Sequence, residues 1–282
     1  MNGAFGETAV HSSSVIEPGA KLGAGVRIGP FCHVSGDTVL GDGVELISHV
    51  SVQGRTSIGA RTVVGPQTVL GGQPQNFKHK GSPTDLVIGS DCTFRENVTI
   101  HLGSDTGHGR TVVGDNCYLM AYAHIAHDCI VGNNIVMANC ATLGGHCEVG
   151  DNVSIGGLTA VHQFVRVGHH AFVAGCSALV GDLIPYGMAM GNRAGLRGFN
   201  IIGMKRSGFP RSQILVMREA YRAIFESGGT VAENAAAARA TFADNSGVVE
   251  MIDFLTNRGK RIYCMPNRSR DGSASDDGAN EG

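Results

Sequence analysis

The chain has 282 residues, of which 42 are glycine and 16% are charged, and its formal net charge is −2. Lysine and arginine form no strong cluster, which argues against nucleic acid as a partner, because such a partner requires a basic face. The N-terminal region holds no secretory signal, and no apolar run reaches the roughly 20 residues that span a bilayer, so we expect no transmembrane segment and a cytoplasmic protein.

An apolar side chain recurs at every sixth position through most of the chain. The series runs over 16–70, resumes over 88–100 and continues over 113–179, and all 25 positions are apolar. A small or β-branched residue often stands two positions earlier, which places both side chains on one face of a short strand. Each hexad therefore predicts a strand and a corner. Three strands close a triangular coil of 18 residues, and stacked coils form a parallel β-helix.

Five of the eight cysteines occupy the small inward position of this repeat. A free cysteine in that place behaves as a small apolar residue. We therefore expect these cysteines to be reduced packing residues, as in a cytosolic protein, and not nucleophiles or disulfides. They are Cys32, Cys92, Cys117, Cys129 and Cys147.

The series breaks twice, at residues 71–87 and 101–112. Both segments lack the six-residue pattern, so they predict loops that project from the β-helix, which we assign to residues 11–188. Long loops on a rigid scaffold commonly carry function. We therefore expect these two loops to contribute to a site.

Beyond the repeat, the spacing of apolar residues becomes helical. A stripe begins near residue 211, and the segments 231–243 and 248–255 predict two more helices. We assign 189–265 to a small C-terminal α-helical domain, which would cover the open edge of the last coil. Residues 266–282 are rich in Ser, Asp, Gly and Asn, a composition typical of a disordered tail whose role the sequence leaves open.

Two histidines and a carboxylate fall within five positions of one coil. His124 precedes the inward Ile125 and therefore points outward, whereas His127 lies near a corner. Coils stack about 4.8 Å apart, so residues 18 positions apart share a column. This arithmetic predicts one outward patch that spans three coils and contains His127, Asp128, Gly145, His146 and Gln163.

The patch predicts general-base chemistry. The neutral imidazole of His127 can take a proton near pH 7, and Asp128 would fix its tautomer. Gly145 leaves a backbone N–H accessible to an oxyanion. No serine or cysteine nucleophile lies in the patch, so we expect a substrate hydroxyl to attack directly.

The His-x-x-His spacing also suggests a metal site. On an extended strand His124 and His127 would lie about 10 Å apart, too far to share one ion at about 2.1 Å. We therefore expect no metal, and a zinc site would need histidines from neighbouring subunits. Because ligand sites are concave and a prism face is flat, a second wall must come from another subunit or from the loops. Prisms packed around a three-fold axis would supply such a wall, so we expect a homotrimer with sites between subunits.

Six ordered motifs carry a resemblance to a known family. Over residues 11–265 the chain resembles the UDP-N-acetylglucosamine O-acyltransferases of lipid A biosynthesis. The resemblance implies a left-handed β-helix. It also implies transfer of a (3R)-hydroxyacyl chain from acyl carrier protein to the 3-hydroxyl of the UDP-sugar, the first step of lipid A biosynthesis, with no covalent acyl-enzyme. It implies no cofactor beyond the phosphopantetheine arm of the carrier protein. The motifs are AHIAHDC at 123–129, ATLGGH at 141–146, IGGLTAVHQF at 155–164, GNRA at 191–194, GFNIIGMKR at 198–206 and the loop KHKGSPT at 78–84.

The same resemblance implies a role for each site residue. His127 would be the general base, Asp128 its orienting partner and the Gly145 N–H the oxyanion donor. Gly175 matches the position that limits acyl length, where glycine leaves room for a longer chain. The remaining implied contacts are Asn76, Lys78 and His124 for the sugar or phosphate, His101, His146 and Gln163 as neighbours of the substrate, and Asn200 and Arg206 on the nucleotide or acyl-donor side.

Four positions depart from the usual pattern of that family. Asn76 stands where Asp is expected in the sugar loop, and Leu102, Ile202 and Ser207 also differ. The base is intact, but the acyl chain length stays open, as does the choice between UDP-N-acetylglucosamine and a 3-amino analogue. The alternative function is that of a related hexapeptide transferase that acylates an amino group or uses acyl-CoA.

Overall fold

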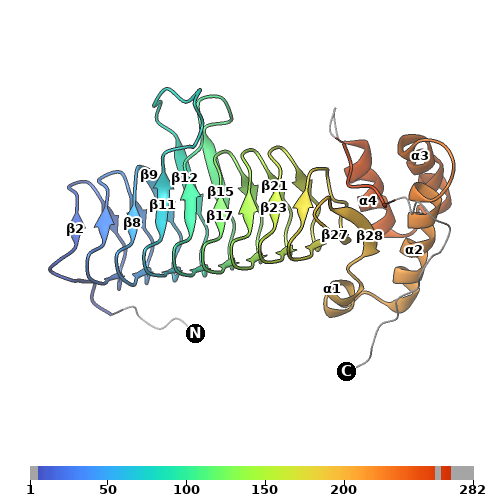
Figure 1. Ribbon diagram of the computed structural model, residues 1–282. Coiled ribbons are helices and arrows are strands. Elements are labelled where there is room, and N and C mark those ends of the chain that lie inside the picture. Colours follow the sequence, from blue (N-terminus) through green and yellow to red (C-terminus); the bar gives the residue numbers. More distant parts are fainter. Residues whose placement is uncertain (1–5, 258–261, 268–282) are drawn as a thin grey trace.

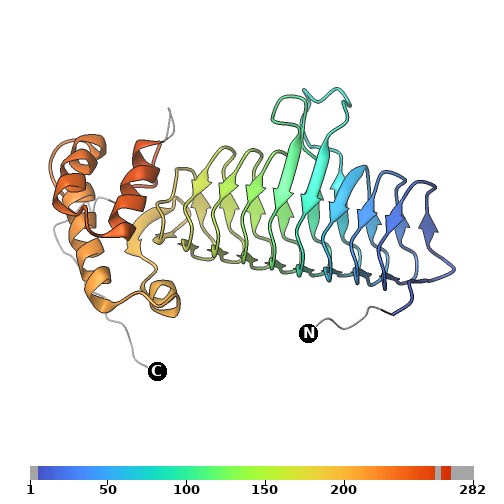
Figure 2. The same ribbon diagram turned by 180° about the vertical axis from the view of Figure 1, so that it is seen from behind.

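A computed structural model describes residues 6–257 and 262–267 as a triangular prism with helices at its C-terminal end. Both insertions rise from one edge of the prism, as Figures 1 and 2 show from opposite sides. We expected the C-terminal tail to be disordered, and its residues from 268 onwards lie outside the part of the chain that the structure describes.

Three sheets form the faces of the prism, and we name them sheets A, B and C. Sheet A contains β1 (Ala9–Val10), β4 (Arg27–Ile28), β7 (Glu45–Leu46), β10 (Val63–Val64), β13 (Thr93–Phe94), β16 (Tyr118–Leu119), β19 (Val136–Met137), β22 (Ser154–Ile155), β25 (Phe172–Val173), β27 (Gly187–Met190) and β28 (Gly195–Phe199). Sheet B contains β2 (Val15–Ile16), β5 (His33–Val34), β8 (Ser51–Val52), β11 (Val69–Gly72), β14 (Thr99–His101), β17 (His124–Ile125), β20 (Thr142–Leu143), β23 (Ala160–Val161) and β26 (Ala178–Leu179). Sheet C contains β3 (Lys21–Leu22), β6 (Val39–Leu40), β9 (Arg55–Ile58), β12 (Asp85–Ile88), β15 (Arg110–Val113), β18 (Ile130–Val131), β21 (Glu148–Val149) and β24 (Arg166–Val167).

The coils stay in register across both insertions. β17 and β20 pair Ile125 with Leu143, which lies one 18-residue coil later. β14 pairs Ile100 with Ile125, and β11 pairs Leu70 with Ile100. The additional residues therefore leave the prism at the corner between sheets B and C, and the inward series continues on the far side of each loop.

The inward side chains of the repeat form one continuous core. Phe94, Leu119 and Ile125 are fully buried, and burial of such a side chain is worth roughly 1.5–3 kcal/mol. In the first coils Ile16 and Leu22 are only partly buried, because fewer coils cover them. The five cysteines predicted to pack in the core are all buried with free thiols.

Many corners hold one residue in the left-handed backbone conformation. Asn134 and Asn152 adopt it with φ of 57° and 60°, which asparagine and aspartate tolerate better than other side chains. Asp128 and His146 occupy corresponding corner positions, with φ of 59° and 62°. The turn of the coil therefore sets the direction in which these two side chains leave the backbone.

Beyond β28, which pairs antiparallel with β27, the chain forms helices. The short helix α1 was not predicted from the sequence, because six residues are too few for a periodic signal. Asn245 accepts a hydrogen bond from the Val248 N–H, and this cap starts α4 before the apolar run that predicted it. None of the described helices has the length and apolarity needed to cross a bilayer. The helices are α1 (Ile201–Arg206), α2 (Arg211–Phe225), α3 (Val231–Thr241) and α4 (Ser246–Thr256).

One arginine ties α4 to the last coils. Arg166 in β24 donates through Nε to Asp182 Oδ2 at 2.7 Å. Its terminal nitrogens donate to the Asn257 and Phe254 carbonyls at 2.9 and 3.1 Å, and its guanidinium lies 4.3 Å from the centre of the Phe254 ring. Because carbonyls at a helix C-terminus lack intrahelical partners, this arginine satisfies two of them while it neutralises a buried carboxylate.

Candidate active site

A cavity of about 460 Å³ lies between the first insertion and the B–C corner of the coils. It brings together residues from segments that are far apart in the sequence, including the predicted base. The structure thus gathers five of the predicted site residues, and it adds a threonine of the second insertion that the sequence did not indicate. The lining residues are Gln75, Asn76, Phe77, Lys78, Thr106, His127, His146, Gln163 and Phe164.

The predicted base and carboxylate are in direct contact. His127 Nδ1 lies 2.8 Å from Asp128 Oδ2, and because a carboxylate only accepts, Nδ1 carries the proton. Nε2 is then the nitrogen with a free lone pair. The His127 side chain is 12% exposed and that of Asp128 is 0% exposed, so only the imidazole is accessible from the cavity.

Asp128 lies beside His127 as expected for the patch, but the second insertion covers its carboxylate, which the sequence did not indicate. Ser104 donates to Asp128 Oδ2 through Oγ at 2.5 Å and to both carboxylate oxygens through N at 3.1 Å. Gly109 N donates to Oδ1 at 3.2 Å. Burial acts to raise the pKa of the Asp128 carboxyl, but hydrogen bonds from Ser104 and His127 outweigh it and keep that pKa below its usual range.

His146 lies beside the base and against an aromatic ring. Its ring stacks on Phe164 with centroids 4.4 Å apart and meets the His127 ring edge-on at 5.1 Å. Burial lowers the pKa of His146, although the nearby Asp128 charge acts in the opposite direction. This histidine is therefore mainly neutral at pH 7 and can exchange hydrogen bonds with a substrate.

These groups also lie close enough to one another to share a cation. His127, Asp128 and His146 can each offer one ligand atom, and these atoms all lie within 4.8 Å of one another. The Asp128 oxygens, however, already accept hydrogen bonds from His127, Ser104 and Gly109. A cation would have to displace these donors, so the arrangement favours acid–base chemistry.

His124 and His101 lie next to the base but do not line the cavity. His124 Nδ1 is 2.7 Å from Thr99 Oγ1, and its ring meets that of His101 edge-on at 4.8 Å. His101 is 8% exposed, so its ring packs against His124 and does not face solvent. Burial, with the nearby His124 and His127, lowers the pKa of His101 to about 4.

Gly145 packs directly behind the imidazole. A Cβ at this position would lie 2.8 Å from His127 Cε1 and 2.9 Å from Nε2. Among the hydrogen bonds between described residues, none uses the Gly145 N–H. Glycine is therefore required here for close approach, and its N–H is available to a ligand.

Replacing this glycine should move the base. In Gly145→Ala, the added methyl group displaces the His127 ring from its bond to Asp128, and we expect kcat to fall at least about 10-fold, the effect of losing one charge-assisted hydrogen bond. Gly228→Ala is the control, because a Cβ there meets nothing within 4 Å. Steady-state kinetics with thermal melts test this, and wild-type turnover in a folded Gly145→Ala variant would contradict it.

Three further predicted residues lie away from both the cavity and the histidines beside it in a single chain. Gly175 is exposed at the A–B corner, where a Cβ would lie 3.2 Å from the Gly157 carbonyl oxygen. Asn200 caps α1, since its Oδ1 accepts from Gly203 N at 2.9 Å and its Nδ2 donates to the His170 carbonyl at 3.0 Å. Arg206 ends α1 and is exposed. One chain alone does not bring these residues to the base.

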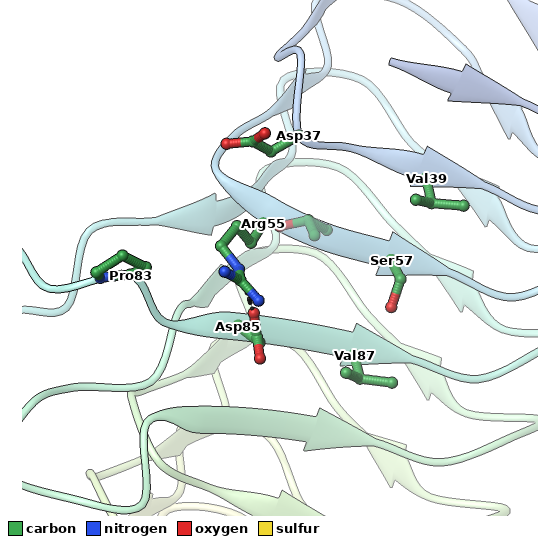
Figure 3. A pocket seen from close by; sticks show the side chains of 8 residues that line it. Asp37, Val39, Arg55, Ser57, Pro83, Asp85 and Val87 are labelled. Carbon is green, nitrogen blue, oxygen red and sulfur yellow. Dashed lines mark hydrogen bonds and ion pairs between the residues drawn. The ribbon is translucent and has the colours of Figure 1, made fainter. Parts of the chain in front are cut away.

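A second cavity, of about 510 Å³, lies over sheet C and is shown in Figure 3. The Arg55 guanidinium points to Asp85 and pairs with it at 2.7 Å, beside Pro83 of the first insertion. Its lining contains no histidine or cysteine, so we place the candidate active site in the cavity that contains His127.

Known proteins resemble this chain over nearly its whole length. A family model described as "Udp N-acetylglucosamine O-acyltransferase; Domain 2" matches residues 182–264, and a bacterial transferase hexapeptide model matches 110–145. The acyl-[acyl-carrier-protein]–UDP-N-acetylglucosamine O-acyltransferase of Mesorhizobium japonicum is 61% identical over 272 residues, covering 96% of this chain and 98% of that protein. The chain belongs to the UDP-N-acetylglucosamine O-acyltransferase family. A family member from Bartonella bacilliformis is 50% identical and covers 94% of this chain and 96% of its own.

Solved structures of this acyltransferase family share the fold. A crystal structure of a UDP-N-acetylglucosamine acyltransferase matches with a TM-score of 0.88 and 38% identity, covering 92% of this chain and 99% of that one. The LpxA structure from Acinetobacter baumannii matches with a TM-score of 0.88 and 35% identity, over 90% and 99% of the two chains. The predicted fold, a left-handed parallel β-helix followed by C-terminal helices, is confirmed.

Proposed function

We propose that this enzyme transfers a (3R)-hydroxyacyl chain from acyl carrier protein to the 3-hydroxyl of UDP-N-acetylglucosamine, the first step of lipid A biosynthesis. The relatives at 50–61% identity are named for this acyl donor and sugar. The observation that carries the proposal is the His127–Asp128 pair, whose imidazole is accessible from a cavity while its carboxylate is buried. Chemistry of this kind needs no metal and no cofactor in the protein.

In the proposed mechanism His127 Nε2 removes the proton from the sugar 3-hydroxyl as its oxygen attacks the thioester carbonyl. The developing imidazolium is stabilised by the Asp128 carboxylate, which accepts from Nδ1 at 2.8 Å. The Gly145 N–H is suited to donate to the oxyanion of the tetrahedral intermediate. Collapse of that intermediate expels the phosphopantetheine thiolate, which takes the proton from His127, so no acyl-enzyme forms.

The other cavity residues fit substrate binding. Lys78 is exposed on the first insertion, where its ammonium can meet a phosphate of the UDP-sugar. Asn76, His146 and Gln163 line the same cavity and offer neutral hydrogen bonds to the sugar. His124 lies in β17, three residues before His127 in the same coil.

We propose a homotrimer in which a neighbouring subunit completes each site. Gly175, Asn200 and Arg206 have implied substrate roles but lie outside the cavity of a single chain. Apolar corner residues such as Tyr122 and Leu158 are 61% and 67% exposed along the A–B edge, which favours a partner there.

The eight free thiols are consistent with a reducing, cytoplasmic compartment.

The test incubates purified protein with UDP-N-acetylglucosamine and a series of (3R)-hydroxyacyl carrier proteins of increasing length, and detects products by mass spectrometry. We expect one preferred chain length and a 3-O-acylated sugar. Product only from a 3-amino sugar would move the acceptor to an amine, and product only from acyl-CoA would move the donor. Absence of product with every pair would overturn the proposal.

A further inference from the structure

A chain of hydrogen bonds runs from the first insertion to the base. Asn76 Nδ2 lies 2.8 Å from Thr106 Oγ1, and Thr106 Oγ1 lies 3.1 Å from Ser104 Oγ. Ser104 Oγ lies 2.5 Å from Asp128 Oδ2, which is 2.8 Å from His127 Nδ1. Four consecutive contacts therefore link the cavity wall to the imidazole through both inserted loops.

The direction of each hydrogen bond follows from its partners. The backbone N–H of Lys78 donates to Asn76 Oδ1 at 3.0 Å. This bond fixes the Asn76 amide so that its Nδ2 faces Thr106. Asp128 can only accept, so Ser104 donates its hydroxyl proton there. Thr106 must then donate to Ser104 and accept from Asn76. Every donor points toward the carboxylate, and bonds aligned in this way polarise one another.

The two ends of the chain differ in exposure. Ser104 is fully buried and the Asp128 side chain is 0% exposed. Thr106 is exposed and Asn76 is partly exposed, and both line the cavity. A sugar bound in the cavity would therefore meet the outer end of the chain, while the inner end holds the base.

We propose that Ser104 and Thr106 are positioning residues that couple the cavity wall at Asn76 to the orientation of His127. The inference rests on the proposed function, since it assigns these hydroxyls to the same acyl transfer. Neither touches the reacting atoms. Ser104 fixes the Asp128 carboxylate by donating a hydrogen bond to it. Thr106 donates a hydrogen bond to Ser104 Oγ, which leaves the Ser104 proton directed at that carboxylate.

The amide at position 76 is part of the same arrangement. A carboxylate there could not donate to Thr106, which would turn its own proton toward position 76 and away from Ser104. The departure of Asn76 from the acidic residue expected in the sugar loop thus gives a chain whose donors all point to Asp128. A second contact between the loops, from Ser82 Oγ to Asp105 Oδ2 at 3.2 Å, is not part of this chain of hydrogen bonds and provides a control.

The test compares Ser104→Ala, Thr106→Val and the double variant with wild type. We expect Ser104→Ala to lower kcat about 10-fold, with KM within about 2-fold of wild type, because the loss acts on the base and not on sugar binding. Without the Ser104 hydrogen bond the pKa of Asp128 rises, so the acid limb of the kcat/KM profile should move to higher pH. Thr106→Val should lower kcat about 3-fold in the wild-type background.

The double variant decides whether Thr106 acts through Ser104. We expect Thr106→Val to cause no further loss of kcat once Ser104 is alanine, because non-additivity of this kind marks residues that act as one unit. Thr106→Ser should restore wild-type kcat, and Ser82→Ala should leave it unchanged. Equal losses from Thr106→Val in both backgrounds would overturn the coupling.

The remaining outcomes separate this inference from the proposed function. Wild-type kcat and an unmoved pH profile in Ser104→Ala would overturn the positioning role alone. If Ser104→Ala fails to fold, the exposed Thr106 carries the test, and wild-type kcat in Thr106→Val would overturn the coupling. Absence of acyl transfer by wild-type protein would overturn the proposed function, and the catalytic role of these hydroxyls with it.

Discussion

His127→Ala should lower kcat by about 10³-fold while the coil stays folded. General-base catalysis by a positioned histidine contributes typically about 10²–10⁴-fold, and His127 is the residue whose imidazole is held by Asp128 and lines the cavity. KM for the sugar should change little, because the proton is transferred in the transition state. Single-turnover assays with acyl carrier protein substrate measure the loss.

Two variants control this result. His33→Ala removes another partly exposed histidine of sheet B, which is paired with Glu17 and lies four coils away from β17, and it should keep wild-type kcat. Asp128→Asn should also lower kcat, because an amide carries no charge to stabilise the imidazolium and its NH2 group would face the N–H donors that the carboxylate accepts. Turnover by folded His127→Ala at the wild-type rate would remove the base from the mechanism.

Arg166→Met should destabilise the C-terminal end of the protein by about 3–5 kcal/mol, the usual cost of removing one partner from a buried ion pair. The Arg166 and Asp182 side chains are 12% and 1% exposed, so the variant leaves a carboxylate buried without its cation. It also removes the donors to the Asn257 and Phe254 carbonyls. Urea unfolding followed by helix circular dichroism measures this loss.

The matched control for that variant lies in the helical region itself. Arg239 pairs with Asp253 on the surface, with side chains 44% and 53% exposed, so Arg239→Met should cost less than about 1 kcal/mol. Because repeat coils contact mainly their neighbours, the Arg166→Met loss should appear first in the helical signal. Equal midpoints for the two variants would show that the buried pair contributes nothing special.

The prism was predictable because its rule is local and repeated. A six-residue period leaves one choice of inward face, so Leu119, Ile125 and Met137 could be placed in the core without coordinates. The same arithmetic brought His127 and Gly145 together, since stacked coils convert a sequence spacing of 18 into spatial contact.

The environment of Asp128 was not predictable in this way. The second insertion has no period, so the sequence does not say which way it folds or what it covers. Ser104 is one hydroxyl among several in that loop, and only its position marks it. Helix α1 likewise has too few residues to show a period, and the contact of its capping residue Asn200 with the His170 carbonyl is a tertiary one that the sequence does not reveal.

The way the ladder closes after each insertion has a consequence for engineering. Leu70 pairs with Ile100 and Ile100 with Ile125 as if the intervening loops were absent, so a corner accepts additional chain without altering the phase of the coil. Scaffold and loops can therefore diversify separately. The scaffold changes by whole coils, whereas an inserted loop can change by any number of residues. Grafting a foreign loop at the B–C corner of another coil is a natural route to new binding sites on this prism.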